Sequence, residues 1–467
     1  MVSQGGPLWS LAIIAILVVL VRLAVFMVYP QDGPQVERGL APDGWLNIAR
    51  NVISGHGYSN PPDIPTARRG PTVVYFFAAV LWLGGDHLWS ILLAQWLADV
   101  GTAILLFFIA REIFQDRRVA VLAAFLFAFY GPGLAFTFSA WSEPVFTLVL
   151  AGFSLSLLRA LRQPSLRRFA ISGALLGLAV LARPVMQFYP LLVLPLIWWN
   201  LGRSWRRVMP HFAVFCSVFA IVLLPWIVRN YLVFQAFIPG SSHSGDAFYQ
   251  GNVALAQPDY LRYRSTGEAM IVLRQTLEAR FGPVPAHLTL RSYVKAKGVN
   301  EYQFDRIAFG EAMKLIRAFP DRYVLTSLVR LVRFWLGVRF VSLVQGKDSP
   351  WAYQVPVVNG VLLILAALAV ACFRGAWLRS AVPLIVLVAY TTAVYAATLA
   401  IARFSVPIMP YVMLLAAHSI IHILPKLGKA GSVVLALLER CDRSARPVAD
   451  PPSVRYGYRK LATASGF

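Results

Sequence analysis

The sequence predicts an all-α polytopic membrane protein, with about ten transmembrane helices and additional helices lying on the outer membrane face. Of its 467 residues, 58% are hydrophobic and only 14% are charged, which is far from the averages of soluble proteins. The hydrophobic residues fall into repeated stretches, several of which approach the roughly 20 residues that a membrane-crossing helix needs. Inside a bilayer a helix satisfies its own backbone amides, so these stretches are expected to be helical.

The predicted spans follow one another along most of the chain. The first, 8–29, has no basic segment before it and no small-residue cleavage site, so we interpret it as a retained helix rather than a cleaved signal. Two spans, 171–181 and 189–199, are short in apolar length. The full set is 8–29, 88–110, 119–138, 145–161, 171–181, 189–199, 212–228, 351–373, 381–399 and 404–424.

The basic residues are arranged as in a membrane protein, which argues against a nucleic-acid partner. The formal net charge is +22, from 43 Lys and Arg against 21 Asp and Glu. Short connections between spans carry many of the arginines, as cytoplasmic loops do. Basic residues also follow position 424, so we expect a transmembrane module over 1–424 and a basic cytoplasmic tail over 425–467. The loop arginines are Arg111, Arg117, Arg118, Arg159, Arg162, Arg167, Arg168, Arg203, Arg206 and Arg207.

Two further apolar stretches are interpreted as lying at the outer interface. The first, 72–83, is too short to span comfortably. The second, 323–344, contains three arginines, and each would cost roughly 2.5–3.5 kcal/mol at the centre of a span. The outer face then holds a loop over 30–87, a short corner before Pro144, and a segment over 230–350 that includes two amphipathic helices. We therefore expect the chemistry to be external.

Two acidic residues lie just past the ends of apolar segments on this outer face. Asp43 precedes a short stretch with helical spacing of apolar residues, 45–53, and the alternative to a catalytic role is that it caps this helix. Glu143 lies at the lip between two spans, where an ionisable group marks a functional site by default and capping is the plainer reading. These two residues are the candidate catalytic pair.

Basic and polar residues on the same face are candidates for binding substrate. Arg68 and Arg69 precede a predicted interfacial helix, and their guanidiniums suit phosphate oxygens, although this motif taken alone favours lipid-headgroup anchoring. The loop over 239–246 is rich in Gly and Ser and presents backbone amides, though such residues also fill ordinary loops. The full set of predicted substrate-binding residues is Tyr58, Arg68, Arg69, Arg229, Asn230, Ser241, His243 and Arg403.

In their order along the chain, these motifs resemble those of the GT-C superfamily of glycosyltransferases. These are polytopic enzymes that use polyprenyl-phosphate-linked sugars, and they include protein O-mannosyltransferases and lipid A aminoarabinose transferases. One departure is that the first-loop acid is a lone Asp followed by Gly rather than an acidic pair. The resemblance rests on Asp43 with Leu46-Asn47-Ile48-Ala49, Gly55-His56-Gly57-Tyr58, Arg69-Gly70-Pro71, Glu143, the segment 177–184, Pro225-Trp226 with Arg229-Asn230, the loop residues Pro239, Ser241, Gly245, Gly251 and Asn252, and the segment 403–410.

The resemblance implies an inverting sugar transfer at the extracytoplasmic face, in a bacterial inner membrane. A polyprenyl phosphate is already a good leaving group, so the site needs positive charge around it and one base for the acceptor hydroxyl. We assign the base to Asp43, the charge to Arg68, Arg69, Arg229 and Arg403, and an orienting role to Glu143. The predicted partners are a polyprenyl-phosphate-linked sugar donor, a glycan, lipid or protein acceptor, and the bilayer. A divalent cation is an option without a supporting ligand motif.

Two other classes of function share much of this pattern. A transporter or flippase of a lipid-linked glycan also has many spans and intramembrane arginines. Against it, the sequence shows no internal repeat and gathers its acids on one face. A lipid-linked polysaccharide polymerase or ligase has the same external geometry but transfers a whole glycan. Observing which species moves, a sugar or an intact lipid-linked substrate, distinguishes these classes.

Overall fold

The computed structural model describes residues 6–28, 43–138, 140–262, 266–283, 297–337, 354–372 and 376–423. The predicted tail 425–467 and the first part of the outer loop, 30–42, lie outside the described residues. Within them, the regular elements are helices, apart from one isolated antiparallel bridge between Ser59 and Pro65. The all-α prediction is confirmed for this part of the chain.

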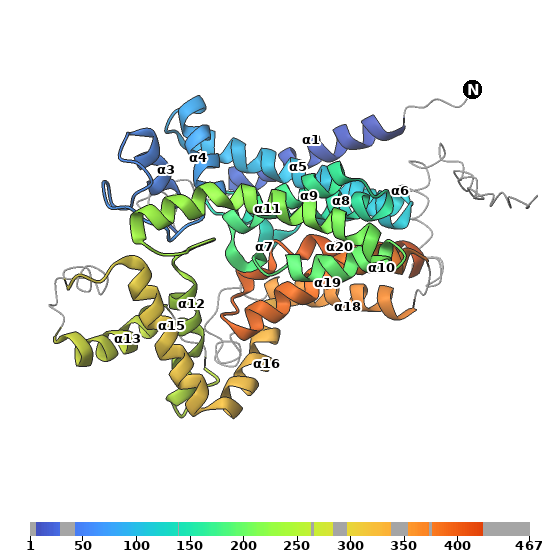
Figure 1. Cartoon of the computed structure of the whole chain (residues 1–467). Helices are drawn as coiled ribbons and strands as arrows, with labels where there is room; N and C mark the ends of the chain where they lie inside the picture. Colours follow the sequence, from blue (N-terminus) through green and yellow to red (C-terminus); the bar gives the residue numbers. More distant parts are fainter. Residues whose placement is uncertain are drawn as a thin grey trace, which may run out of the picture.

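The long apolar helices lie side by side in a bundle (Figure 1). Five are long and apolar enough to cross a membrane, and several shorter apolar helices pack among them, so the chain is a multi-pass integral membrane protein. The five are α1 (Gly6–Val28), α5 (Leu88–Phe114), α8 (Glu143–Arg162), α11 (Trp205–Phe234) and α19 (Ala376–Ala397). The shorter ones are α4 (Pro71–Gly84), α6 (Arg117–Ala128), α9 (Leu166–Ala182), α10 (Pro190–Asn200), α18 (Gln354–Cys372) and α20 (Met409–Ile423).

One predicted span is interrupted. The stretch 119–138 was expected as a single helix, but α6 ends at Ala128 and a separate short helix, α7 (Gly131–Leu134), follows. The break falls at Gly131-Pro132-Gly133, where the proline lacks an amide proton and the glycines carry no side chain to favour the helix. The other predicted spans each coincide with a helix, although whether each of the shorter ones crosses the membrane stays a prediction.

Close approach of backbones holds α9 in the bundle. A Cβ on Gly173 would lie 2.3 Å from the carbonyl oxygen of Phe215 in α11, and one on Gly177 would lie 2.8 Å from the Val222 side chain. Small residues of this kind let helices pack closely in a bilayer. As a result, the end of α9 at Ala182 is fixed against α11, and Arg183 follows directly.

A buried ion pair joins α1 to α5. Arg22 Nη2 lies 2.9 Å from Asp99 Oδ2, and its Nη1 donates a 2.9 Å hydrogen bond to the carbonyl of Ala128. Both charged side chains are at most 5% exposed. An acid therefore lies inside the predicted span 88–110, which the expectation that the acids gather on one face did not include. A buried charge needs a partner, and Asp99 supplies it.

Six described helices, including α4 of the bundle, lie at one end of the molecule (Figure 1). They are α3 (Trp45–Ile53), α4, α12 (Ser244–Asn252), α13 (Thr266–Phe281), α15 (Glu301–Ala318) and α16 (Pro320–Leu336). The buried Arg330 of α16 donates to the Asn252 side chain at 2.9 Å and so joins α16 to α12. The helix ends at Gly337, with a left-handed φ of 65°, and is not among the long apolar helices. Whether 323–344 lies at the interface stays a prediction, since 338–350 lies outside the described residues.

Candidate active site

Asp43 lies immediately before α3 but does not cap it. The N-cap position belongs to Gly44, whose φ of 78° is left-handed, and no side chain caps the helix there. Glycine reaches this conformation without the steric penalty of a Cβ. The interpretation of Asp43 as a helix cap is therefore wrong. Its carboxylate, 22% exposed, turns towards two guanidinium groups instead.

Arg69 provides the first of these guanidiniums. Its Nη2 lies 3.3 Å from Asp43 Oδ1, and its Nε donates a 2.9 Å hydrogen bond to the backbone carbonyl of Asp43. The guanidinium lies over Trp45, 5.4 Å from the ring centroid. The adjacent Gly70 is packed so tightly that a Cβ there would lie 2.0 Å from the Leu181 carbonyl oxygen. The segment before α4 is thereby held against the end of α9.

Arg403 joins the two acidic residues that the sequence singles out. It lies in the 3-10 turn η4 (Ala402–Ser405), just before α20. Its Nη2 lies 2.5 Å from Asp43 Oδ2, and its Nε lies 2.9 Å from Glu143 Oε1. The guanidinium also lies over Trp141, 4.3 Å from a ring centroid. One planar cation therefore bridges two carboxylates from distant parts of the chain.

Glu143 is the first residue of α8 and is 1% exposed. Its Oε1 accepts a 2.5 Å hydrogen bond from Nη2 of Arg183, a residue that the predicted site omits. Arg183 also donates to Ser142 Oγ, at 2.8 Å from Nη2 and 3.2 Å from Nε. Sequence reasoning included Arg183 in the segment 177–184 but gave it no role. The signal available was an arginine at the end of an apolar stretch.

These side chains form a continuous series of alternating charge, which we call the ionic chain. Its members, in order of contact, are Arg69, Asp43, Arg403, Glu143 and Arg183. Burial acts to raise the pKa of the Asp43 carboxyl, but the guanidiniums of Arg69, Arg403 and Arg183 outweigh it and hold this pKa below its usual value. The ionic chain contains one more guanidinium than carboxylate, so its net charge suits an anionic ligand.

Arg229 and Tyr58, both predicted to bind substrate, hold the backbone beside the ionic chain. Arg229 donates from Nη1 to the Thr66 carbonyl at 2.8 Å and from Nη2 to the Tyr58 carbonyl at 2.9 Å. Its guanidinium lies over the rings of Tyr58 and Trp226, at 5.4 Å and 5.1 Å. The Tyr58 hydroxyl donates to the Arg69 carbonyl at 2.8 Å. These contacts give both residues a structural role, and binding of substrate by them stays a prediction.

Asn230 and Ser241 are also engaged by the protein. Asn230 accepts a 2.9 Å hydrogen bond from Arg229 Nη1 and donates one of 2.9 Å to the Ile238 carbonyl. Ser241 Oγ donates to the Arg68 carbonyl at 2.5 Å. The Gly- and Ser-rich loop therefore packs along the segment that carries the two adjacent arginines.

Arg68 belongs to a second charged cluster that adjoins the first. Its Nη2 lies 3.5 Å from His243 Nε2 and 3.7 Å from Asp246 Oδ2, while His243 Nδ1 lies 3.1 Å from the same carboxylate oxygen. A guanidinium only donates, so this geometry assigns the imidazole proton to Nδ1. Burial, with Arg68 and Arg69 nearby, lowers the pKa of His243, and the neighbouring Asp246 offsets this effect only in part.

Glu301 connects the two segments that carry these residues. At the start of α15, it accepts hydrogen bonds from the Thr66 hydroxyl at 2.8 Å, the Ala67 amide at 3.0 Å and the Ser242 hydroxyl. Sequence reasoning missed Glu301. An acid in the first turn of an amphipathic helix is common, and its pattern carries no sign of such distant partners.

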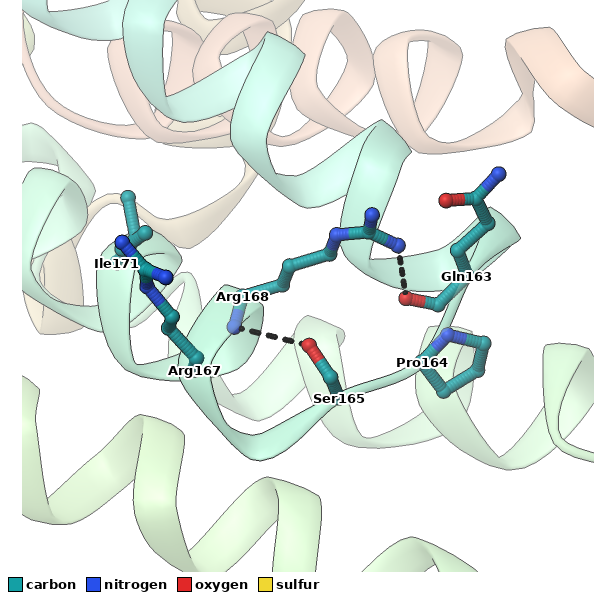
Figure 2. A pocket seen from close by; sticks show the side chains of 6 residues that line it. All are labelled: Gln163, Pro164, Ser165, Arg167, Arg168 and Ile171. Atoms are coloured by element: carbon teal, nitrogen blue, oxygen red, sulfur yellow. Dashed lines mark hydrogen bonds between the residues drawn. The ribbon is translucent and has the colours of Figure 1, made fainter.

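Two cavities in the described part of the chain lie away from the ionic chain. One, of about 560 Å³, is located where α8 gives way to α9, at the far end of α8 from Glu143 (Figure 2). A second, of about 240 Å³, is apolar and lies among α5, α18, α19 and α20. The two acids are thus brought together by direct contacts with guanidiniums. The first cavity is lined by Gln163, Pro164, Ser165, Arg167, Arg168 and Ile171.

The helical architecture is shared with solved membrane proteins. The oligosaccharyltransferase of Archaeoglobus fulgidus in its apo form superposes with a TM-score of 0.52 at 14% identity, over 92% of this chain and 52% of that one. The same archaeal enzyme in complex with an inhibitory peptide and a dolichol-phosphate gives a TM-score of 0.50 at 16% identity, over 94% of this chain and 52% of that one. These likenesses concern the fold.

A family match falls on the part of the chain that supplies most of the ionic chain. Residues 68–228 match the model of the dolichyl-phosphate-mannose-protein mannosyltransferase family, and the segment contains Arg69, Glu143 and Arg183. This segment, about a third of the chain, is similar to that mannosyltransferase family. Asp43 and Arg403 come from outside the matched segment and reach it through the contacts described above.

Curated relatives match a similar share of the chain. An undecaprenyl phosphate-alpha-4-amino-4-deoxy-L-arabinose arabinosyl transferase of Pseudomonas paraeruginosa is 29% identical over 148 residues, which are 30% of this chain and 27% of that protein. The protein of that name in Pseudomonas aeruginosa is 28% identical over the same length and coverage. The match thus spans about a quarter of the length of these relatives.

Proposed function

We propose that this chain is a GT-C glycosyltransferase. It would transfer a sugar from a polyprenyl-phosphate-linked donor to an acceptor hydroxyl at the extracytoplasmic membrane face, by inverting displacement. The observation that carries the proposal is the bridge that Arg403 makes between Asp43 and Glu143. A base and phosphate-binding cations are the two things that such a transfer requires, and the bridge brings them into one group.

The guanidiniums are the proposed site for the donor phosphate. Arg69 and Arg403 are 17% and 23% exposed, so both reach the solvent-accessible side of the ionic chain. Arg68 is 24% exposed and lies beside them, with Ser241 and His243 along the same segment. Guanidinium forks pair well with phosphate oxygens, and burial strengthens the interaction. We propose that Tyr58, Arg229 and Asn230 contribute chiefly by holding this segment in place.

In the proposed displacement, Asp43 removes the proton of the acceptor hydroxyl. The acceptor oxygen forms a bond to the anomeric carbon from the face opposite the phosphate, while the bond between that carbon and the phosphate oxygen breaks. The polyprenyl phosphate leaves with the bonding electrons, and Arg69 and Arg403 balance its new charge. Because phosphate leaves readily as an anion, no protonating acid is needed. Glu143 orients Arg403 and, through it, Asp43.

The donor class is supported by the relatives. The curated proteins are named for undecaprenyl phosphate, and the archaeal oligosaccharyltransferase was solved with a dolichol-phosphate. We propose a polyprenyl monophosphate donor for this chain, in a bacterial inner membrane. The arginines of the α8–α9 and α10–α11 connections lie at the end of the bundle opposite Asp43. Basic loops favour the cytoplasmic side, which supports an orientation with Asp43 on the extracytoplasmic side.

The proposal is tested with purified protein, a polyprenyl phosphate carrying a labelled sugar, and lipids and glycans extracted from bacterial envelopes as acceptors. We expect the label to pass to an acceptor and free polyprenyl phosphate to appear in equal amount. Release of a whole glycan to the acceptor would favour a polymerase or ligase. Passage of intact donor across reconstituted vesicles, with no new bond, would favour a transporter and reject the proposal.

A further inference from the structure

Both carboxylate oxygens of Asp43 are engaged by guanidiniums, which conflicts with its proposed role as the base. Oδ1 lies 3.3 Å from Arg69, and Oδ2 lies 2.5 Å from Arg403. A base must offer an oxygen to the acceptor hydroxyl, and a carboxylate paired on both oxygens has little tendency to take a proton. The charged groups facing Asp43 come from three places: Arg69 before α4, Arg403 in η4 and, further away, Arg183 after α9.

The ionic chain has a fixed end and a more accessible end. Glu143 and Arg183 are 1% and 9% exposed, and Arg183 is also held by Ser142. The side chains of Arg69 and Arg403 are 17% and 23% exposed, which is roughly two to three times the exposure of Arg183. Arg403 contacts the fixed end through Nε and Asp43 through Nη2. It can therefore release Asp43 from one nitrogen while Glu143 keeps hold of the other.

We propose that the donor phosphate exchanges with Asp43 for the guanidiniums of Arg403 and Arg69, so that the base is released only when the donor is in place. The inference rests on the proposed function for the identity of the anion. Asp43 then acts as a placeholder for the donor phosphate, and Glu143 with Arg183 are positioning residues that keep Arg403 within reach of both partners.

Charge balance across the reaction is consistent with this exchange. Before transfer, the two guanidiniums face one negative charge on Asp43 and one on the phosphodiester of the donor. After transfer, Asp43 holds the acceptor proton and is neutral, while the phosphate product carries two negative charges. The negative charge facing the guanidiniums is thus unchanged, which matters because an uncompensated charge is costly in a poorly solvated site.

The inference is tested by carboxyl labelling in the absence of any transfer. A water-soluble carbodiimide reacts with protonated carboxyl groups, so the labelling rate of Asp43, followed by mass spectrometry at fixed pH, reports its protonation and accessibility. We expect undecaprenyl phosphate to raise this rate about tenfold, which corresponds to a pKa increase of about one unit. Glu143 serves as an internal reference, because Arg183 keeps it paired in both states.

Variants show whether the guanidiniums are responsible. In Arg403→Gln, Asp43 should label quickly without lipid, and the lipid should add little. Arg69→Gln provides a second variant with the same expected direction, should the first fail to fold. Arg167→Gln, an exposed arginine at the opposite end of the bundle, should behave as the unmodified protein.

Labelling of Asp43 that is unchanged or slowed by undecaprenyl phosphate overturns the inference. The result is separable from the proposed function. Sugar transfer without faster labelling keeps the function and removes the exchange. Faster labelling without transfer to any acceptor keeps the exchange as a property of a phosphate-binding site and removes the proposed reaction.

Discussion

Glu143 Oε1 and Arg183 Nη2 lie 2.5 Å apart, and neither side chain is more than 9% exposed. This pair fixes the carboxylate from which Arg403 extends towards Asp43. A buried ion pair adds little stability relative to apolar residues, but removing one partner leaves a charge without compensation. The pair therefore sets the geometry of the site and makes the site sensitive to substitution.

Arg183→Met should strongly destabilise the protein, because it leaves the Glu143 carboxylate buried with one guanidinium fewer. We expect the free energy of unfolding to fall by about 3–5 kcal/mol, measured by denaturant titration in micelles. The double variant Glu143→Gln with Arg183→Met should recover part of this loss, since no unpaired carboxylate remains. The single variant Glu143→Gln completes the comparison. If the loss of unfolding free energy in the double variant equals the sum of the losses in the two single variants, the two residues are not coupled.

Asp43→Asn should lower sugar transfer by about 10²- to 10⁴-fold, the range expected when a general base is lost. The protein should still fold, because asparagine keeps the shape of the side chain. Asp86→Asn is the matched control: Asp86 pairs with Arg50 at 2.7 Å, but the carboxylate is 46% exposed and outside the ionic chain. Initial rates of both variants decide the point, and equal rates would remove Asp43 from its assigned role.

Arg229→Met should act on stability rather than on the donor directly. The substitution removes hydrogen bonds from a guanidinium to the carbonyls of Thr66 and Tyr58, and hydrogen bonds to charged groups contribute about 1.5–3 kcal/mol each. We expect the free energy of unfolding to fall by at least about 2 kcal/mol. Normal stability with weakened binding of polyprenyl phosphate would instead assign Arg229 to the donor.

Gly70→Ala should disturb the site through the backbone. The added Cβ would lie 2.0 Å from the Leu181 carbonyl oxygen, so the segment that carries Arg69 must shift. We expect lower transfer and a lower melting temperature. Gly310→Ala is the control, since a Cβ there meets nothing within 4 Å and alanine favours a helix such as α15. Similar melting temperatures for the two variants would argue against the tight packing at Gly70.

The pairing of Asp43 should also be visible as a pH-dependent stability difference. Its pKa is lowered by Arg69, Arg403 and Arg183 against the effect of burial, so its ion pairs stabilise the folded state above the ordinary aspartate pKa of about 3.9. The stability gap between the protein and Asp43→Asn should be constant above this pH and close as the pH falls through the lowered pKa. A gap that closes near pH 6 would show that Asp43 is not paired in this way.

The sequence predicts the helices well because apolar length alone determines them in a bilayer. It also identifies Asp43, Glu143, Arg69 and Arg403 as a group through the resemblance to GT-C proteins. It does not predict which of these touch, because the contacts of Arg403 depend on how the turn before α20 meets α8 and α3.

Three misses have a common physical reason. The partners lie on another element in each case, so the local sequence pattern does not predict them. The residues concerned are Arg183, Glu301 and Asp99. A single acid inside an apolar helix, such as Asp99, becomes interpretable only when Arg22 is placed opposite it. By contrast, the break between α6 and α7 is readable from Gly131-Pro132-Gly133 alone.

The contact between Arg403 and Asp43 joins residues 360 positions apart. A ribosome must therefore have made nearly the whole described chain before the turn at Arg403 can reach its partner. Until then, the Asp43 carboxylate lacks the cation that its Oδ2 contacts in the folded chain. A product truncated before η4 would lack Arg403, and with it the link between Asp43 and Glu143.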